Sequence, residues 1–485
     1  MVDREIYNKV SMWFEAHKEE MIKDIIRLVR IESISQPGKD DTPFGKGCLR
    51  ALEEMLQIGR EHGFYAENYD NVVGSIGNKN KNWDNLVGFW NHLDVVPVGN
   101  GWEYDPFAPV VREHFLIGRG AQDNKGPAVG ILYMMQCLRE LHIPLQHELC
   151  LFVGTDEERG MEDMEYYTAH YPVPKLSMIA DSGFPVCYGE KGIMEGRMVA
   201  KECVTAQVLK AYGGSAANMI PDRAGVLLAD SKALREELGG LEKNGTEEKE
   251  IDWVIRPEGI EIIGYGASRH SAFPEGSVNA IHKLSAFLIK LASLSEADRT
   301  IFSGVEKLCR EYYGEETQIA YEDTVSGKTT CAATVLTMEE GHLCLTLNIR
   351  YAITAKHDQA DQALRAWGMA NQMEWKLERN SKPNYFPKEH PAVERLTGIY
   401  NEITGRKEQS FVMGGGTYAR KLPNAFAYGI GGMEQNDLDR EAKERLFQAG
   451  HGGAHEPDEA LNLRLLLEAM KIYTMAVIAL NEIEL

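Results

Sequence analysis

The sequence predicts an α/β fold: a mixed, mostly parallel sheet with helices on both faces, and a second, α+β domain inserted into it. One observation is the strand–helix–strand order of the apolar runs at residues 86–90, 130–138 and 149–153, which is typical of a parallel βαβ unit. Another is that polar clusters follow short apolar runs, as they do at the carboxyl ends of parallel strands. A third is that the pattern changes near residue 190 and returns after a proline-rich segment at 381–387.

The elements of the first domain follow from periodicity. Apolar residues spaced three, four and seven apart predict a helix over residues 4–30, and a second helix over 46–62 ends before Gly63. Short apolar runs predict buried strands, and a longer run predicts a crossover helix between two of them. The expected strands and crossover helix cover residues 86–90, 130–138, 149–153 and 178–180.

The domain organisation is discontinuous. We expect residues 1–190 and 386–485 to form one domain and residues 191–385 to form the inserted one. The insert alternates strand-like runs with helical ones, and helical patterning resumes after it. The expected segments are strands at 260–264 and 342–349 and helices at 280–294, 392–404 and 459–483.

Composition restricts the partners and the compartment. The net charge of −21 argues against nucleic acid or an anionic membrane as a partner, because both require a basic patch. The eight cysteines are scattered without a Cys-x-x-Cys pair, which favours a reducing, cytoplasmic compartment. The N-terminal segment shows no secretory signal, and no run approaches the roughly 18 apolar residues of a membrane helix.

Four polar clusters predict a metal site. They contain His92 with Asp94, Asp123, the Glu157–Glu158 pair and Asp181, and three of them follow a predicted strand. Because parallel strands end at one edge of a sheet, we expect these side chains to converge on one pocket. A single His-x-Asp or Glu-Glu pattern is usually structural or surface charge, whereas four in succession indicate a site.

The residue types suit two metal ions. A dinuclear hydrolytic site needs imidazoles and carboxylates as ligands, one carboxylate that bridges, and a base that is not a ligand. His92 can be a ligand oriented by Asp94, and Asp123 lies on a glycine-rich turn that can hold a bridging carboxylate. The side chains of Glu157 and Glu158 diverge from an extended backbone, so one is expected as ligand and the other as base.

These motifs resemble those of the dinuclear zinc or manganese metallopeptidases that include aminoacylase, carnosinase, succinyl-diaminopimelate desuccinylase and the PepV-type dipeptidases. The matching segments are His92-Leu93-Asp94-Val95-Val96-Pro97, Gly118-Arg119-Gly120-Ala121-Gln122-Asp123-Asn124-Lys125-Gly126-Pro127, Gly154-Thr155-Asp156-Glu157-Glu158 and Asp181-Ser182-Gly183-Phe184-Pro185. The resemblance implies a zinc-exopeptidase-like catalytic domain and an inserted lid domain with ferredoxin-like halves.

The resemblance also implies roles. Glu157 is expected as the general base, Asp94 behind His92, and a cis peptide bond after the bridging Asp123. A late histidine completes the site, and the Pro-Asp-Glu that follows His455 favours it over His451. The implied metal ligands are His92, Asp123, Glu158, Asp181 and His455.

Further matches lie in the insert and beyond it. Asn218 resembles a lid residue that contacts substrate, and His270 resembles the donor that stabilises the oxyanion, although Arg269 replaces a small residue. Arg350 resembles the clamp on the substrate's carboxylate, although Ala352 replaces a proline, and it can equally be a salt-bridge residue. Gly415, Gly416 and Thr417 are expected as further donors to that carboxylate; they lack the G-x-G-x-x-G pattern of a nucleotide site.

We therefore expect a metal-dependent dipeptidase, closest to the PepV type, that uses two divalent ions of zinc, manganese or cobalt. The alternatives are an N-acyl-amino acid deacylase or β-alanyl dipeptidase with the same site and, more remotely, a metal-binding module without catalysis. The expected partner is a small dipeptide, without nucleic acid or membrane. Because the insert of about 195 residues is nearly twice the lid of dimeric relatives, we expect a monomer.

Overall fold

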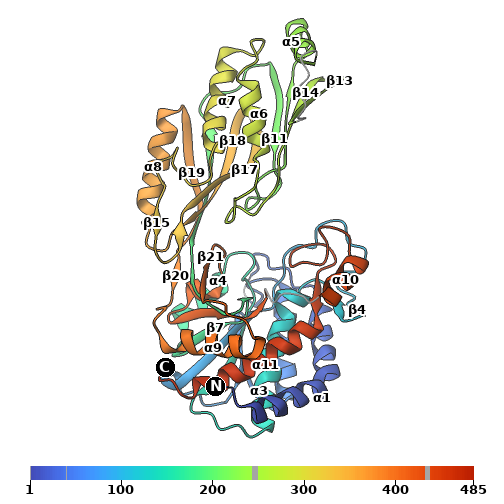
Figure 1. Ribbon diagram of the computed structural model, residues 1–485, viewed down its shortest axis with the longest axis vertical. Helices are drawn as coiled ribbons and strands as arrows, with labels where there is room; N and C mark the ends of the chain where they lie inside the picture. Colours follow the sequence, from blue (N-terminus) through green and yellow to red (C-terminus); the bar gives the residue numbers. More distant parts are fainter. Residues whose placement is uncertain (1, 40, 243–249, 432–436) are drawn as a thin grey trace. The chain divides into compact units, whose positions relative to one another are not determined.

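The computed structural model describes residues 2–39, 41–242, 250–431 and 437–485, and it divides into two compact units (Figure 1). Among these residues, no helix has both the length and the apolar character of a membrane span. Most of unit 2 is one segment inserted into unit 1. A short stretch later in the chain, Val412–Gly415, also belongs to unit 2. Unit 1 comprises Met1–Gly189, Asn384–Phe411 and Gly416–Leu485, and unit 2 comprises Glu190–Pro383 and Val412–Gly415.

The sheet of unit 1 has a parallel centre. Its four central strands are neighbours and run parallel, and α3 (Gly126–Glu140) connects two of them as the predicted βαβ crossover. Strands on both sides of this centre pair antiparallel, so the sheet is mixed, which confirms the predicted fold class. In order across the sheet, the strands are β1 (Tyr65–Tyr69), β2 (Val73–Gly77), β6 (Glu148–Gly154), β3 (Leu86–His92), β7 (Leu176–Ile179), β22 (Ala425–Tyr428), β9 (Val186–Glu190) and β20 (Asn384–Tyr385).

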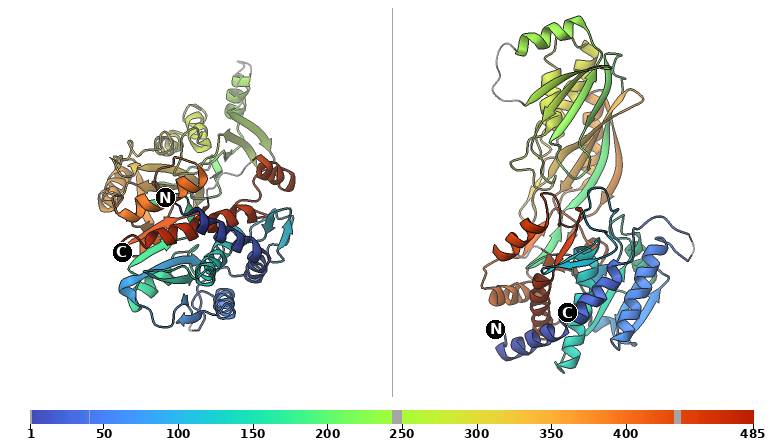
Figure 2. Two further views of the ribbon diagram at one scale, coloured as in Figure 1. Left: turned by 60° about the horizontal axis from the view of Figure 1, so that its bottom comes forward. Right: turned by 90° about the vertical axis from the view of Figure 1, so that its right-hand side faces the viewer.

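Helices cover both faces of this sheet. Phe89 and Trp90 are adjacent in β3, so their side chains point to opposite faces. The ring centroid of Phe89 lies 5.9 Å from that of Tyr473 in α11 (Leu463–Leu480), and that of Trp90 lies 5.4 Å from that of Tyr167 in α4 (Glu162–His170). On the α11 side, α1 (Arg4–Val29) and α3 lie beside α11 (Figure 2). The other helices of unit 1 are α2 (Lys46–Glu61), α9 (Pro391–Thr404) and α10 (Asp437–Leu446).

Two predicted helix boundaries are wrong. The last helix begins at Leu463 and not at residue 459, because residues 460–462 form β24 and pair with β5 (Phe115–Ile117). The Asn462 side chain then caps α11 by accepting hydrogen bonds from two backbone N–H groups. The helix predicted over 280–294 ends at Leu288, where i→i+3 hydrogen bonds close the chain into a turn.

The large sheet of unit 2 is antiparallel and has two halves. Four strands form each half, and β11 pairs with β17 where the halves join. Alternate residues of β10, such as Met194 and Met198, face a core that α6, α7 and α8 also line, as expected for an α+β domain. In order, the strands are β13 (Ile251–Arg256), β14 (Gly259–Tyr265), β12 (Arg223–Leu228), β11 (Val208–Gly213), β17 (Thr330–Glu339), β18 (His342–Tyr351), β10 (Gly192–Ala200) and β19 (Met373–Ser381), and the helices are α5 (Lys232–Glu242), α6 (Ala280–Leu288), α7 (Glu296–Cys309) and α8 (His357–Ala370).

Candidate functional site

Three polar clusters of unit 1 lie at one edge of the sheet. Strands β6, β3 and β7 are parallel neighbours, so their carboxyl ends meet there. His92 is the last residue of β3, Glu157 follows the end of β6, and Asp181 follows the end of β7. The Nε2 atom of His92 lies 3.6 Å from Oδ2 of Asp181. The fold thus brings together side chains that are up to 89 positions apart in the sequence.

Asp123 lies between the two histidines that were expected as ligands. It sits in the short helical turn η2 (Ala121–Lys125), which follows Gly120 with a left-handed φ of 81°. The Asp123–Asn124 peptide bond is cis, as the resemblance implied. Oδ1 of Asp123 lies 2.9 Å from Nε2 of His92, and Oδ2 lies 3.2 Å from Nε2 of His455.

Two groups of three residues share Asp123. In each group the nitrogen and oxygen atoms that can bind a metal lie within 4.8 Å of one another: His92, Asp123 and Asp181 in one, and Asp123, Glu158 and His455 in the other. Imidazole nitrogen and carboxylate oxygen suit divalent ions such as zinc, and positive ions would offset the repulsion among the carboxylates. The residues therefore fit two divalent ions with Asp123 common to both.

His451, the alternative to His455, lies outside both groups. Its Nδ1 atom is 2.6 Å from Oδ2 of Asp458, a buried carboxylate that also accepts hydrogen bonds from two backbone N–H groups of the 103–104 segment. His451 thus helps to hold a loop, whereas His455 reaches Glu158 at 3.0 Å.

Glu157 lies beside the two groups without belonging to either. Burial raises the pKa of Glu157 well above its ordinary value; His92 opposes this rise, while the negative charges of Asp181 and Glu158 add to it. A carboxylate with a raised pKa next to a metal site has the properties of a general base.

The carboxylate of Asp94 holds the glutamate pair in place. Its two oxygens each accept a backbone hydrogen bond at 3.0 Å, one from Glu157 and one from Glu158. The Nδ1 atom of His92 lies 3.0 Å from the backbone carbonyl oxygen of Asp94 and 3.5 Å from its carboxylate. Asp94 therefore orients His92 mainly through its main chain, which differs from the expected contact through the carboxylate.

Glu459 and Arg119, both 1% exposed, form a buried ion pair that was not predicted. The carboxylate of Glu459 accepts hydrogen bonds from the backbone N–H groups of Gln122 (2.9 Å) and Asp123 (3.0 Å) and from Arg119 (2.8 Å). Arg119 also donates to the backbone oxygen of His455 at 3.4 Å. The Arg119–Glu459 ion pair thus holds the turn that carries Asp123 against the loop that carries His455.

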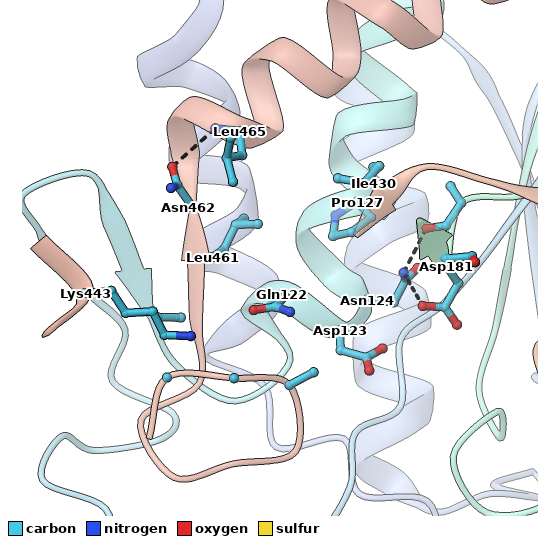
Figure 3. Close-up of a pocket in the computed structure, with 16 residues that line it drawn as sticks. Gln122, Asp123, Asn124, Pro127, Asp181, Ile430, Lys443, Leu461, Asn462 and Leu465 are labelled. Atoms are coloured by element: carbon cyan, nitrogen blue, oxygen red, sulfur yellow. Dashed lines mark hydrogen bonds between the residues drawn. The ribbon is translucent and has the colours of Figure 1, made fainter. Parts of the chain in front are cut away.

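Asn124 orients Asp181 and was also missed. Its side-chain nitrogen donates to Oδ1 of Asp181 and to the backbone oxygen of Ala180, both at 3.0 Å (Figure 3). Its side-chain oxygen accepts a hydrogen bond from Asn91. Such contacts fix the direction of a ligand. The position of Asn124 directly after Asp123 was the only available signal.

Unit 2 gathers three predicted substrate-binding residues. The backbone N–H of Ser271 bonds to the backbone oxygen of Asn218 at 2.8 Å, which places His270 next to Asn218. The Ser271 hydroxyl donates to the Asn348 side-chain oxygen (2.8 Å), which also accepts from Nε of Arg350 (2.9 Å). Arg350 is 6% exposed, and its Nη1 donates to the backbone oxygen of Gly414 at 2.9 Å.

His270 has one defined tautomer. Its Nδ1 atom accepts a hydrogen bond from the backbone N–H of Ala272 at 3.1 Å, so in the neutral ring the hydrogen is on Nε2. Burial and the positive charge of Arg350 lower the pKa of His270, which keeps the ring neutral near pH 7. The Nε2–H group is then a hydrogen-bond donor, as an oxyanion contact requires.

The three expected donors after residue 414 are divided between the units. Gly415 belongs to unit 2, and Gly416 and Thr417 belong to unit 1. The Thr417 hydroxyl accepts a hydrogen bond from the backbone N–H of Ala419 at 3.2 Å. Their role toward a substrate carboxylate stays a prediction.

Metal binding is expected to release protons. Burial alone would lower the pKa of His92, but its hydrogen bond with Asp123 raises it above the ordinary value, and Asp123 and Glu158 raise the pKa of His455 to about 11. Without metal, the His455 ring is therefore protonated at pH 7 and the shift at His92 also favours its protonated form, whereas a ligand must be neutral. Affinity for zinc or manganese should then rise with pH.

Calorimetry in buffers of different ionisation enthalpy measures this release. We expect at least about one proton per ion. The variant His455→Gln should release fewer protons, and the control His451→Gln, four residues away, should behave as the natural protein does. An affinity that is independent of pH between about 6 and 9 would contradict the expectation.

Comparison with known proteins adds three findings. Residues 88–479 match the sequence profile of "Peptidase family M20/M25/M40". The chain is 29% identical over 476 residues to "Putative dipeptidase YtjP" of Bacillus subtilis, covering 95% of this chain and 97% of that protein. Human carnosine dipeptidase 1 (15% identity, TM-score 0.56, 100% of both chains) and the dipeptidase Dug1p of Saccharomyces cerevisiae (13% identity, TM-score 0.55, 98% of both chains) share the fold.

Proposed function

The chain belongs to peptidase family M20/M25/M40 and is a metallopeptidase, and we propose that it hydrolyses dipeptides with two divalent ions bound in unit 1. The observation that carries this proposal is the pair of ligand groups that share Asp123, with Glu157 beside them and outside both. A metal-binding module without catalysis would have no use for a base in that position.

The residues divide the chemistry between them. When bound, two divalent ions lower the pKa of water and polarise the peptide carbonyl. Glu157 takes the proton of the attacking water and passes it to the leaving amine as the C–N bond breaks. Asp94 fixes the backbone of Glu157, and the Nε2–H group of His270 donates to the oxyanion.

We propose that unit 2 serves as a lid that recognises the carboxylate end of the substrate. Arg350 supplies a guanidinium group of fixed direction, because Asn348 and Gly414 each accept one of its hydrogen bonds. Asn218 also contacts the substrate. Gly415, Gly416 and Thr417 add further hydrogen-bond donors to the substrate's carboxylate. A clamp on a free carboxylate favours short substrates, which agrees with the dipeptidase names of the relatives.

Metal removal and a substrate panel test this function. After chelation we expect no turnover, and re-addition of zinc, manganese or cobalt should restore it, with the most active ion identifying the working metal. Dipeptides should be better substrates than N-acetyl amino acids and β-alanyl dipeptides. Preference for either of the latter classes would establish the alternative, a deacylase or a β-alanyl dipeptidase with the same site.

Replacing Arg350 by Lys should raise KM for dipeptides about 10- to 100-fold, because the single ammonium group cannot reproduce the planar fork of donors. Dipeptide amides, which lack the carboxylate, are the control substrates. The natural enzyme should process them poorly, and Arg350→Lys should change their KM little. Equal effects on both substrate series would show that Arg350 is only a structural residue.

We also propose that the protein acts as a monomer in the cytoplasm. The two halves of the unit 2 sheet join within one chain, so a second copy is not needed to extend it. All eight cysteines are free, which fits a reducing compartment. Light scattering should give the 54.4 kDa of one chain, and twice that mass would refute the monomer.

A further inference from the structure

A cavity of about 310 Å³ lies in unit 1 next to the metal-binding groups. Asp123 and Asp181 line one end, and apolar side chains such as Ile430, Leu461 and Leu465 line its walls (Figure 3). The volume is sufficient for one amino-acid side chain, and mixed apolar and polar walls are typical of small-molecule sites.

The other end of the cavity carries a positive charge. Lys443 of α10 is the only cationic residue among the described residues that line the cavity, and Figure 3 shows its amino group on the side of Gln122. No ion pair connects Lys443 to a carboxylate in the part of the chain that the structure describes. Its charge is therefore available to an anion.

Asn462 adds a hydrogen-bond donor with a fixed direction. Its side-chain oxygen accepts from the backbone N–H groups of Arg464 (3.0 Å) and Leu465 (3.2 Å), so the amide cannot be reversed. The nitrogen points away from the helix (Figure 3), and this 6% exposed residue has no partner for it among the described residues. A buried donor without a partner is costly unless a ligand binds it. The N-terminus of α11 contributes further positive potential here.

We propose that this cavity binds the side chain of the substrate's first residue and that Lys443 and Asn462 select a carboxylate there. The inference rests on the proposed dipeptidase function. The carbonyl that water attacks belongs to the first residue, so the side chain of that residue must lie within a few bonds of the metal-binding groups. The cavity begins at two of these ligands, Asp123 and Asp181. Dipeptides that begin with aspartate or glutamate are then the preferred substrates.

A panel of Glu-Ala, Gln-Ala, Leu-Ala and Lys-Ala tests the selection. We expect the natural enzyme to prefer Glu-Ala over Leu-Ala at least about tenfold in kcat/KM, as one charge-assisted contact allows. Lys443→Met should reduce that ratio about tenfold, and Lys443→Glu should shift the preference toward Lys-Ala. The control Lys407→Met, at an exposed position outside the cavity, should leave the ratio unchanged.

Asn462→Asp separates the role in the cavity from the role as helix cap. Aspartate caps a helix as well as asparagine does, but it replaces the donor by a negative charge. We therefore expect an unchanged melting temperature and a reduced preference for Glu-Ala. An unchanged preference together with an unchanged melting temperature would assign Asn462 to the cap alone and overturn its part in the proposal.

Direct binding gives a second measurement. Calorimetry with metal-loaded Glu157→Gln should show Glu-Ala binding about tenfold more tightly than Leu-Ala, and adding Lys443→Met should remove the difference. If the natural enzyme cleaves Leu-Ala and Glu-Ala with equal kcat/KM, the proposed subsite is refuted and the dipeptidase function stands. If it cleaves no dipeptide with any metal, both are refuted.

Discussion

Replacing Glu157 by glutamine is expected to lower turnover by a factor of about 100 to 10,000 while metal binding is retained. The side chain belongs to neither ligand group, so the ligands stay intact. Its backbone hydrogen bond to Asp94 does not involve the side chain, so the loop should keep its position. What the amide cannot do is accept the proton of the attacking water.

Two measurements distinguish this result from a structural defect. Metal content per chain and dipeptide affinity should equal those of the natural protein, and only kcat should fall. Glu158→Gln is the matched comparison, because it changes the neighbouring carboxylate that belongs to a ligand group. That variant should lose metal affinity. If Glu157→Gln loses metal and Glu158→Gln does not, the two roles are reversed.

The second large effect is expected at Glu459. Glutamine there leaves the buried guanidinium of Arg119 without its counter-charge, which costs about 3–5 kcal/mol in the free energy of unfolding of unit 1. It also weakens the hold on the backbone of Asp123, so affinity for metal should fall about 10- to 100-fold. Urea titration and metal titration measure the two quantities.

An exposed ion pair in the same unit provides the control. Glu113 and Arg445 lie 3.1 Å apart with exposed side chains, so Glu113→Gln should change stability by less than about 1 kcal/mol and leave metal affinity unchanged. If Glu459→Gln changes metal affinity no more than Glu113→Gln does, the ion pair does not position the site.

The fold of unit 1 could be predicted because its central strands are buried on both faces. The run at residues 86–90 is continuous and apolar, and the parallel order of β3, α3 and β6 leaves few arrangements. The start of α11 could not be predicted in this way. Residues 460–462 are extended only because β5, more than 300 residues earlier, pairs with them.

The site could be predicted where its residues are chemically distinctive and follow strands. His92, Asp123, Glu158, Asp181 and His455 do lie together. Contacts that depend on tertiary structure could not be predicted. The carboxylate of Asp94 bonds to backbone groups more than 60 residues away, and the Arg119–Glu459 pair joins residues that no local pattern relates.

Arg119 and Glu459 lie 340 positions apart in the chain, and this separation imposes an order on biosynthesis. When the ribosome has made the first 190 residues, the chain contains most of the ligands, but Arg119 has no counter-charge and His455 does not yet exist. Unit 2 comes next and is nearly continuous, so it can fold while translation proceeds. The group of Asp123, Glu158 and His455 can be completed only after His455 has been made, long after the other four ligands.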